Sequence, residues 1–494
     1  MDQKPFLHLG GIRDVETFRS YLQELLLSIP CDTDLLAGDT SPLGQPLHRG
    51  GIELGNRFAI QPMEGWDGTT DGRPTELTFR RWRRFGASGA KLIWGGEAVA
   101  VCHEGRANPN QLAIGPHSVT DLSQLRQALI EEHERSVGSV DGLVIGLQLT
   151  HSGRFSRPNN HTRSEPRILY RHPILDQRLG ITDDQPLLAD EEIKRIIEYF
   201  QRAAQVARQA GFNFVDIKHC HGYLGHEFLS AHTRTGEYGG SFENRTRFLR
   251  EVVTGIRSLA SGLNIGVRLS VFDTVPFKPD PQSSMPGKPG RGVPEPFAAL
   301  IPYRWGFGVN PANPLEADLT EPIQFLALLS DQDINLVNFS AGSPYYNPHL
   351  QRPALYPPSD GYQPPEEPLR AVAQQMQVTR ALKERFPNLI IIGSAYTYLQ
   401  DFLPHVAQAA VREGWVDCVG LGRMVLSYPT LPLDVINGRA LQRKRICRTF
   451  SDCTNAPRAG LPSGCYPLDR RYRESDEAAQ LKESKLRRTD KVST

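Results

Sequence analysis

Eight short apolar runs recur along the chain and alternate with stretches whose apolar residues have helical spacing. The runs are Phe58–Met63, Leu92–Trp94, Leu143–Leu149, Phe214–Ile217, Ile265–Leu269, Leu336–Phe339, Leu389–Gly393 and Cys418–Leu421. The helical stretches include Glu191–Ala210, Phe242–Leu259, Val372–Phe386 and Gln400–Glu413. Strands that alternate with helices favour right-handed crossovers and a parallel sheet, and eight such units close into a (β/α)8 TIM barrel of the α/β class. The order alone also allows an open sheet.

Three segments stand outside this repeat. Residues 1–46 form a leader with one amphipathic helical stretch, and residues 47–440 hold the barrel. Within the barrel, residues 272–317 are rich in proline and glycine and too long for an ordinary loop, so we expect an irregular excursion that caps the substrate at the catalytic rim. Residues 441–494 form a C-terminal extension, and its charged end from Arg470 is predicted to be a frayed helix or disordered.

Composition narrows the classes of function. The formal net charge is +1 over 494 residues and the cations are spread along the chain, so we expect no nucleic acid and no membrane surface as partner. No apolar stretch approaches the roughly 20 residues that a membrane helix needs, and the start lacks the apolar core of a signal peptide. Seven cysteines, an odd number in a long chain, argue against a secreted disulfide scaffold. We therefore expect a cytoplasmic protein.

Reactive side chains gather where the fourth apolar run ends. Phe214–Ile217 is followed by Lys218, His219, His221 and Tyr223. In a barrel the carboxyl ends of the strands face the active site, so a cluster of titratable groups at such an end favours a catalytic role. The alternative is structural, with the histidines bonded to backbone in the core and the tyrosine packed in the following helix.

Six pieces of the chain carry a resemblance to a known family. They are Asn56–Met63, Glu97–Val101, Gln148–Arg154, His221–Tyr223 with Asn244–Arg245, Val267–Leu269 and Gly420–Arg423. In these pieces and in their order, the chain resembles the Old Yellow Enzyme family of FMN-dependent oxidoreductases over roughly residues 48–440. The resemblance implies FMN in the mouth of the barrel, NADH or NADPH as reductant, and a small-molecule substrate with an electron-poor double bond.

The resemblance also implies a bed for the flavin ring. Arg268 corresponds to the family residue beside flavin N1 and O2, where a cation stabilises the negative charge of the reduced ring. Gln148 can offer a donor and an acceptor to the pyrimidine edge. The backbone at Pro62, Met63 and Ala98 completes the bed. As alternatives, Arg268 can belong to a buried ion pair and Gln148 can be an ordinary polar strand end.

The phosphate of FMN requires backbone N–H groups and a cation, and in barrels this site follows the seventh and eighth strands. Gly393 and Ser394 end the seventh run, and Gly422 and Arg423 end the eighth. Glycine lets the backbone approach the ligand, and Arg423 can grip a phosphate with two hydrogen bonds. The structural alternative is that the glycines mark turns and Arg423 lies on the surface.

At the substrate end this chain departs from the family twice. The family binds a substrate carbonyl with a His-x-x-His or His-x-x-Asn pair and protonates carbon from a tyrosine two residues later. Here Lys218 and His221 occupy the pair positions, Tyr223 is the tyrosine, and His219 can replace Lys218 if the strand end is bulged. Glu64 stands where the family has threonine or cysteine near flavin O4, and it either meets the flavin or turns away to an Arg or Lys.

Three cysteines lie close together near the end of the chain, Cys447, Cys453 and Cys465. The dienoyl-CoA reductase and trimethylamine dehydrogenase branch of the family has four cysteines here for an iron–sulfur cluster, and the last two keep that branch's spacing. Phe450 stands where a second thiolate is expected, and four thiolates are the usual requirement. The branch also continues into nucleotide-binding domains, for which this chain ends too soon. The leading prediction is therefore structural cysteines without a metal and less than one iron per chain, with an iron–sulfur cluster and a zinc or partial site as the alternatives.

The leading interpretation is an FMN-dependent oxidoreductase that passes hydride from NAD(P)H to an enone-type or dienoyl-type double bond. Two other reactions stay open at this point. One is flavin-dependent oxidation of an amine or ether with electrons passed to a partner protein, and the other is a Schiff-base lyase that uses Lys218. A flavin-binding protein without catalysis is a further alternative. The sequence also leaves open whether the chain forms a homo-oligomer.

Overall fold

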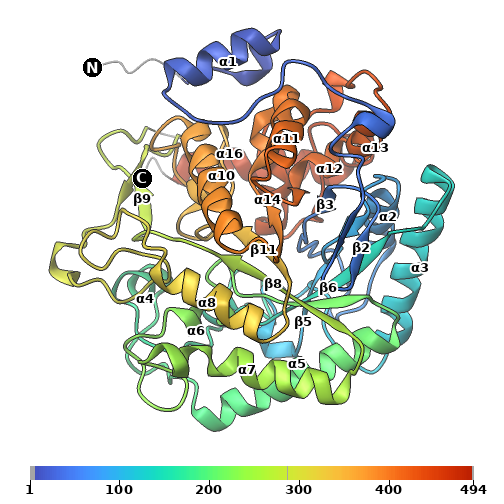
Figure 1. Ribbon diagram of the computed structural model, residues 1–494. Coiled ribbons are helices and arrows are strands. Elements are labelled where there is room, and N and C mark those ends of the chain that lie inside the picture. The colour runs from blue at the N-terminus through green and yellow to red at the C-terminus, as the bar shows by residue number, and fades with distance from the viewer. Residues whose placement is uncertain (1–5, 286–287, 492–494) are drawn as a thin grey trace.

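The eight apolar runs of the sequence form eight parallel strands that close into a barrel. The computed structural model describes residues 6–285 and 288–491 (Figure 1). The barrel strands are β3 (Phe58–Ile60), β4 (Leu92–Ile93), β6 (Val144–Thr150), β7 (Phe214–Ile217), β8 (Asn264–Ser270), β11 (Leu336–Ser340), β12 (Ile390–Gly393) and β13 (Cys418–Leu421). Their order in the sheet is β4-β3-β13-β12-β11-β8-β7-β6, and pairing of β4 with β6 closes the ring. The predicted TIM barrel is confirmed, and the open sheet is excluded.

A short extra strand follows β4 in the sequence and pairs with β6, as β4 does. β5 (Ala98–Ala100) pairs in parallel with the end of β6, after residues 94–97 leave the ladder. This interruption places Ala98 directly opposite Gln148. Two residues predicted to face the flavin ring therefore lie side by side on neighbouring strands.

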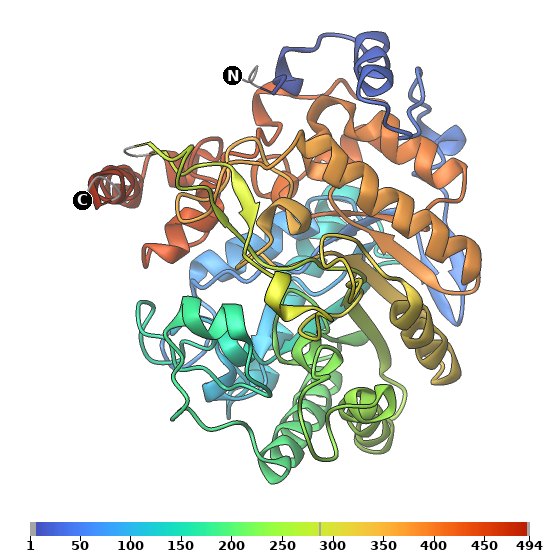
Figure 2. The same cartoon turned by 90° about the vertical axis from the view of Figure 1, so that its left-hand side faces the viewer.

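Helices cover the outside of the barrel (Figures 1 and 2). The main ones are α2 (Glu76–Gly86), α3 (Ser118–Val137), α5 (Asp190–Gln209), α7 (Phe242–Leu259), α8 (Thr320–Asp331), α10 (Pro368–Arg385) and α11 (Leu403–Arg412). α7 matches its prediction, whereas α11 begins three residues late. The cause is Gln400, whose φ of 53° lies outside the helical region, in the 3-10 segment η6 (Tyr396–Phe402). Each long helix turns an apolar stripe inward, as the spacing predicted.

The amino end of the barrel is closed by a hairpin. Strands β1 (Leu47–Arg49) and β2 (Ile52–Leu54) pair antiparallel just before β3. Leu47, Ile52 and Leu54 are buried in one apolar cluster with Trp94 and Phe214 inside the barrel. The hairpin thus seals the end of the barrel opposite the strands' carboxyl ends, where barrel active sites lie.

The segment between β8 and α8 is less irregular than the sequence suggested. It contains a two-stranded hairpin, β9 (Phe277–Pro279) with β10 (Gly292–Pro294), and the 3-10 turn η5 (Ala298–Leu300). Proline and glycine at both strands hid this hairpin, because these residues have low strand propensity. Shorter elements on other connections are η3 (His103–Gly105), η4 (Gly153–Phe155), α4 (Pro173–Leu179), α6 (Leu224–Leu229), α9 (Pro348–Gln351), α12 (Arg423–Ser427) and α13 (Leu431–Ile436).

The described leader packs onto the barrel, and the C-terminal extension follows the last barrel helices. The leader contains η1 (Leu9–Gly11), η2 (Gly38–Thr40) and α1 (Val15–Glu24), whose Phe18 stacks on Phe402 at 4.3 Å between ring centroids. The C-terminal extension contains η7 (Arg443–Arg445), α14 (Asp452–Arg458), α15 (Arg470–Arg473) and α16 (Asp476–Lys491). Figure 2 shows α16 at the edge of the molecule, and its Leu481 is buried against Tyr466 and Tyr472. The charged end is thus helical as far as Lys491, and the predicted frayed terminus beyond it lies outside the described residues.

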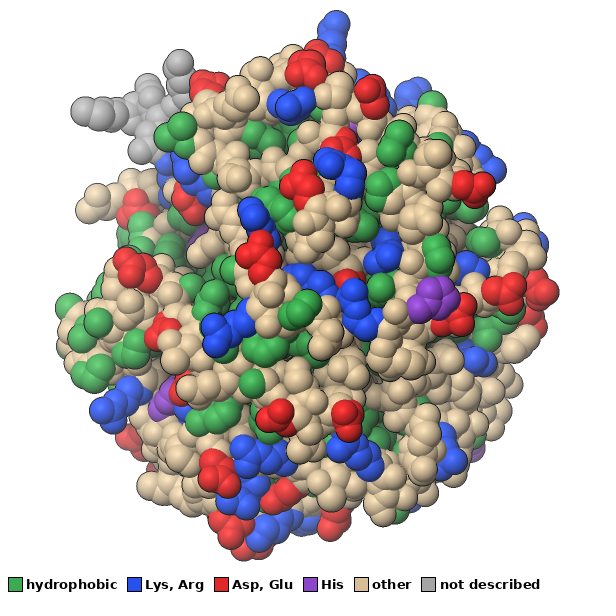
Figure 3. Space-filling model, in the orientation of Figure 1, with side chains coloured by type: hydrophobic (Ala, Val, Ile, Leu, Met, Phe, Trp, Pro, Cys, Tyr) green, Lys and Arg blue, Asp and Glu red, His purple; other side chains and the backbone are tan. Residues whose placement is uncertain are grey.

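The surface carries charges of both signs. On the face shown in Figure 3, Lys and Arg side chains are interspersed with Asp and Glu. Among the described helices, none combines the length and the apolar character that crossing a bilayer requires.

Gly86 provides a test of the close contact between α2 and α3. A Cβ at this position would lie 2.3 Å from the backbone oxygen of Leu129, which cannot move without shifting α3. We predict that Gly86→Ala lowers the free energy of unfolding by about 1–3 kcal/mol, as overpacked sites do. Urea unfolding measures this, with Gly115→Ala as the matched control because a Cβ there meets no atom within 4 Å. Equal stability of the two variants would contradict the packing described here.

Candidate active site

A cavity at the carboxyl ends of the strands holds most of the residues that the sequence predicted. The space between its walls, counted out to the open mouth, is about 1250 Å³. The predicted residues that line it are Pro62, Met63, Glu64, Gln148, Lys218, His221, Tyr223, Arg268, Ser394, Gly422 and Arg423. They come from all sides of the barrel, so residues up to 361 positions apart in sequence share one space.

Three predicted residues do not line this cavity. Ala98 and Gly393 are buried within β5 and β12, and their backbone oxygens accept hydrogen bonds from Gln111 (2.9 Å) and Gln61 (3.4 Å). Their assigned contacts with a flavin stay predictions. His219 lies on the opposite side of its strand, against the rings of Phe248 and Phe325.

The side chains at the end of β7 alternate regularly, which settles the choice between Lys218 and His219. His219 keeps strand pairing, because its N–H donates to the oxygen of Arg268 at 2.8 Å, so the strand end is not bulged. Its Nδ1 contacts the oxygen of Ile217 at 2.8 Å, and burial lowers its pKa to about 4. Lys218 consequently faces the cavity and His219 is a core histidine, the structural alternative considered for it.

A buried carboxylate that sequence reasoning missed organises the floor of the cavity. Asp216 Oδ2 accepts hydrogen bonds from Gln148 Nε2 (2.5 Å) and Trp94 Nε1 (2.7 Å), and its Oδ1 accepts from the backbone N–H of Arg268 (2.7 Å). Asp216 is fully buried, and burial raises its pKa. The carboxylate thereby fixes Gln148 and the strand that carries Arg268. An acidic residue inside an apolar run was the available signal.

Glu64 and Lys218, the two departures from the family pattern, meet each other. Lys218 Nζ lies 2.7 Å from Glu64 Oε1 and 3.8 Å from the centroid of the Tyr223 ring. Tyr223 OH donates to Glu64 Oε2 at 2.8 Å and contacts Tyr345 OH at 2.8 Å. Burial, and then the charge of Glu64, raises the pKa of Tyr223 well above its ordinary value. Glu64 therefore lines the cavity and also pairs with a lysine. The sequence had offered a place beside the flavin and a pairing with Arg or Lys as separate alternatives.

His221 sits on a strained turn beside this group. Its φ is 67°, in the left-handed region that non-glycine residues seldom adopt and that often marks functional sites. Its Nε2 lies 2.9 Å from Ser340 Oγ, and Ser343 Oγ donates to its backbone oxygen at 2.7 Å. Burial, and then the charges of Arg268 and Lys218, lowers the pKa of His221 well below its ordinary value. At neutral pH the side chain is an uncharged imidazole that can exchange hydrogen bonds in the cavity.

Arg268 is a buried cation without a hydrogen-bonded anion. Its side chain is nearly inaccessible, its Nε has no partner, and its guanidinium makes no hydrogen bond within the described part of the chain. Burial lowers its pKa, and the charges of Cys220, Asp216 and Glu64 only partly oppose this. A buried polar group without a partner is costly, so this guanidinium is placed to pair with a ligand and not with another residue.

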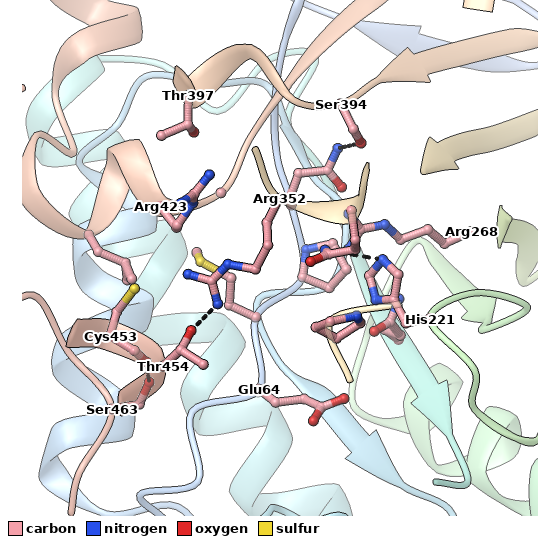
Figure 4. A pocket seen from close by; sticks show the side chains of 18 of the residues that line it. Glu64, His221, Arg268, Arg352, Ser394, Thr397, Arg423, Cys453, Thr454 and Ser463 are labelled. Carbon is pink, nitrogen blue, oxygen red and sulfur yellow. Dashed lines mark hydrogen bonds between the residues drawn. The ribbon is translucent and has the colours of Figure 1, made fainter. Parts of the chain in front are cut away.

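A second positive region lies at the other end of the cavity (Figure 4). Arg352 donates to Thr454 Oγ1 and Arg423 Nη2 donates to the oxygen of Pro353 at 2.8 Å, but Arg352 Nε and Arg423 Nη1 are buried without partners. Burial and the neighbouring charge of Arg423 lower the pKa of Arg352 to about 10. Arg352 was missed because it lies in a loop after β11 with no local motif.

The C-terminal extension forms one wall of the cavity. Cys453, Thr454, Pro457, Arg458 and Ser463 all line it, although the sequence indicated no contact between this extension and the site. Other lining residues that were missed are Gln61, Trp66, Pro344, Tyr345, Gln351, Ala395, Thr397, Gly420 and Leu426. Most lie in loops whose position is set by long-range packing alone.

The three cysteines of the extension come near one another without forming a four-thiolate set. The charges of Cys447 and Cys453 both act on Cys465, yet in the described residues the three sulfur atoms do not all lie within 4.8 Å of one another. Cys447 and Cys465 are buried, and burial raises the pKa of both thiols. The other four cysteines belong to other elements. This donor set does not fit an iron–sulfur cluster held by four thiolates. That the protein contains less than one iron per chain stays a prediction.

Comparison with known proteins identifies the chain's relatives. Residues 42–282 match the NADH:flavin oxidoreductase / NADH oxidase family. An NADPH dehydrogenase from Geobacillus sp. (strain WCH70) is 32% identical over 236 residues, which is 46% of this chain and 62% of that relative. An NADPH dehydrogenase from Bacillus subtilis (strain 168) is 31% identical over 228 residues, or 45% of this chain and 61% of that protein. The match thus spans about three fifths of each relative.

Residues 42–282, just under half of the chain, are thus similar to the NADH:flavin oxidoreductase / NADH oxidase family. This similarity agrees with the predicted class of enzyme, an FMN-dependent oxidoreductase. Solved structures share the fold. A 2-naphthoyl-CoA reductase in complex with 2-naphthoyl-CoA gives a TM-score of 0.62 at 19% identity, covering 87% of this chain and 57% of that one. An old yellow enzyme homologue from Zymomonas mobilis gives a TM-score of 0.53 at 22% identity, covering 81% of this chain and 94% of that one.

The residues that line the cavity fit FMN. Buried N–H groups of Arg352 and Arg423 without partners suit a phosphate, and the open guanidinium of Arg268 suits the ring edge that gains negative charge on reduction. Gly422 also fits, because a Cβ there would meet only the Cβ of Gln61 at 4.0 Å, which leaves its backbone open to a ligand. Arg423, Arg352 and Gly422 would hold the phosphate, and Arg268 with Gln148 would hold the ring.

Asp216 provides a test of how the floor of the cavity is held together. In the natural protein, one Asp216 oxygen accepts from Arg268 N–H and the other accepts from Gln148 and Trp94. Asparagine replaces one of these oxygens with an NH2 group, so one set of donors would face another donor. We predict that Asp216→Asn lowers the free energy of unfolding by about 1–3 kcal/mol, the cost of an unmet buried donor. Urea unfolding measures this, with exposed Asp183→Asn as control. Unchanged stability of Asp216→Asn would remove the organising role of this carboxylate.

Proposed function

We propose that the protein is an FMN-dependent oxidoreductase that passes hydride from NADH or NADPH to an electron-poor carbon–carbon double bond of a small molecule. The observation that carries the proposal is the placement of buried positive charge in one cavity. Arg268 stands at one end, and Arg352 with Arg423 stands at the other (Figure 4), each with donors that no described residue accepts. FMN, when bound, supplies hydride transfer between a nicotinamide and a second substrate.

The protein's own groups prepare the ring-binding end. Arg268 presents a fixed positive charge that needs no reorganisation during the reaction, which is the most effective form of electrostatic stabilisation. Gln148 is oriented by its hydrogen bond to Asp216, so its amide oxygen remains able to accept from a ligand. The names of the relatives, NADPH dehydrogenases, support a nicotinamide as the reductant.

The substrate end can bind an oxygen and deliver a proton. Lys218 Nζ and His221 Nε2 both face the cavity and can donate to a substrate oxygen, which draws negative charge away from the reacting carbon. Tyr223 keeps its proton because burial and Glu64 raise its pKa, and its hydroxyl contacts Tyr345. We assign Tyr223 as the proton donor, with Glu64 as a positioning residue that holds both Tyr223 and Lys218.

Glu64 also favours a second candidate, the oxidation of an amine or ether. Its carboxylate accepts the Tyr223 hydrogen bond at 2.8 Å, so the pair can take a proton from a substrate as well as give one. The spacing of Cys453 and Cys465 supports a place near the dienoyl-CoA reductase and trimethylamine dehydrogenase branch. The Schiff-base lyase is disfavoured, because Lys218 Nζ is already engaged by Glu64 Oε1 at 2.7 Å and does not point freely at a substrate carbonyl.

Anaerobic mixing separates these candidates. We expect the purified protein to be yellow and its flavin absorbance to bleach with NADPH or NADH, and to return on addition of an enone or dienoyl thioester. Bleaching by a methylamine alone would favour the oxidation candidate. A flavin that no nicotinamide and no amine bleaches would overturn both and leave a binding protein without catalysis.

Tyr223→Phe tests the proton donor. We predict that this change slows the return of flavin absorbance with an enone by about 100-fold or more, in line with the loss of a general acid, while bleaching by NADPH changes by less than about 2-fold. Stopped-flow absorbance follows each half separately, and exposed Tyr199→Phe is the control. If both halves slow equally, Tyr223 is not the proton donor.

A further inference from the structure

A second cavity lies next to the first and shares part of its wall. Trp66, Pro344, Tyr345, Pro457 and Arg458 line both. The second cavity, called the rim cavity here, is further lined by residues of the hairpin β9–β10, of α4 and of the loop after η4. None of the predicted site residues lies in it.

Positive charge is in excess in the rim cavity. Its lining includes four permanent cations, Arg157, Arg178, Lys278 and Arg458. Two carboxylates oppose them. Glu295 is shared by Arg178 (2.8 Å) and Lys278 (2.8 Å), and Asp360 pairs with Arg458.

Arg157 is the cation without a carboxylate. It forms no ion pair in the described part of the chain, and its Nη1 donates only to the backbone oxygen of His161 at 3.3 Å. His161 itself is exposed on the same cavity wall. An anion that entered the rim cavity would therefore meet charge that the protein does not already neutralise.

The rim cavity reaches the reactive tyrosine. Tyr345 OH lies 2.8 Å from Tyr223 OH, and Tyr345 belongs to both cavities. Burial and Glu64 raise the pKa of Tyr345, whereas the charges of Arg458 and Arg157 act in the opposite direction. Both guanidinium groups are thus close enough to act on a hydroxyl that touches the proposed proton donor.

Flat aromatic surfaces complete the rim cavity. Tyr345 stacks on Phe155 with 4.1 Å between centroids and 10° between planes, and Trp66, Phe277 and Tyr362 also line the space. Aromatic faces next to arginines bind planar bases by stacking and phosphates by paired hydrogen bonds. A purely apolar ligand would leave these cations desolvated without compensation.

We propose that the rim cavity binds the adenosine diphosphate portion of a molecule whose reactive end enters the first cavity past Tyr345. The inference deepens the proposed function and rests on it. Two molecules that the proposed reaction uses carry this chemistry: a nicotinamide dinucleotide as hydride donor and an acyl-CoA thioester as substrate. Positive charge in excess matches the diphosphate, and the aromatic faces match the base.

Calorimetric titration of the FMN-loaded protein with ADP-ribose and with coenzyme A tests the proposal. We expect at least one of the two to bind, and the binding to weaken as salt is raised, because phosphate contacts are screened. Binding of ADP-ribose alone assigns the rim cavity to the hydride donor, and binding of coenzyme A alone assigns it to a thioester substrate. Binding of neither up to millimolar concentration overturns the inference.

Substitutions in the rim cavity test whether the probe binds there. We predict that the double change Arg157→Gln and Lys278→Gln raises the dissociation constant of the bound probe at least about 10-fold, or about 1.4 kcal/mol. Arg202→Gln, an exposed arginine on the outside of α5, serves as the matched control and should leave it unchanged. Arg157→Lys keeps the charge and should recover part of the affinity. Probe binding unaffected by the double change would also overturn the inference.

A phosphate-free hydride donor separates this inference from the proposed function. With 1-benzyl-1,4-dihydronicotinamide, we expect the double variant and the natural protein to bleach at the same rate. If this donor bleaches the flavin but no probe binds, the proposed function stands and the rim cavity assignment fails. If neither this donor nor NADPH bleaches the flavin, the proposed function itself fails.

Discussion

Buried positive charge without a partner is the constraint on which the account of this protein depends. Arg268, Arg352 and Arg423 each keep at least one N–H group buried and unbonded within the described residues, in a cavity that opens at the mouth of the barrel. Such groups are expensive unless an anion completes them. The barrel places one of them near the end of β8 and two at the opposite end of the cavity (Figure 4), an arrangement that suits an elongated ligand with negative charge at both ends, as proposed for FMN.

The two departures from the family pattern compensate each other. A carboxylate at position 64 alone would oppose negative charge on a reduced flavin, and a lysine at position 218 alone would be a buried cation beside Arg268. Their ion pair at 2.7 Å neutralises both charges locally and leaves the field of Arg268 dominant. Glu64 also accepts a hydrogen bond from Tyr223 OH, so all three side chains form one compact network.

The sequence predicted the barrel because periodicity is a local property. Eight runs became eight strands, and Phe242–Leu259 became a helix with the predicted bounds. Lys218 was singled out for the same reason, since the carboxyl end of each strand is fixed by its run, whereas Gln148 and Arg268 were chosen from the resemblance to a known family. Arg352, Tyr345 and Thr454 were not found, because long loops and the C-terminal extension bring them in through contacts that no local pattern records. Asp216 was visible as an acid in an apolar run, but its partners on two other strands follow only from register.

Titration of the flavin-free protein with FMN and with riboflavin tests the central claim most directly. The two ligands differ only in the phosphate, which Arg352 and Arg423 are placed to grip. The account predicts one FMN per chain and an affinity for FMN at least about 100-fold greater than for riboflavin, since two charge-assisted hydrogen bonds contribute about 1.5–3 kcal/mol each. Equal affinity for both ligands, or no binding of either, would contradict it.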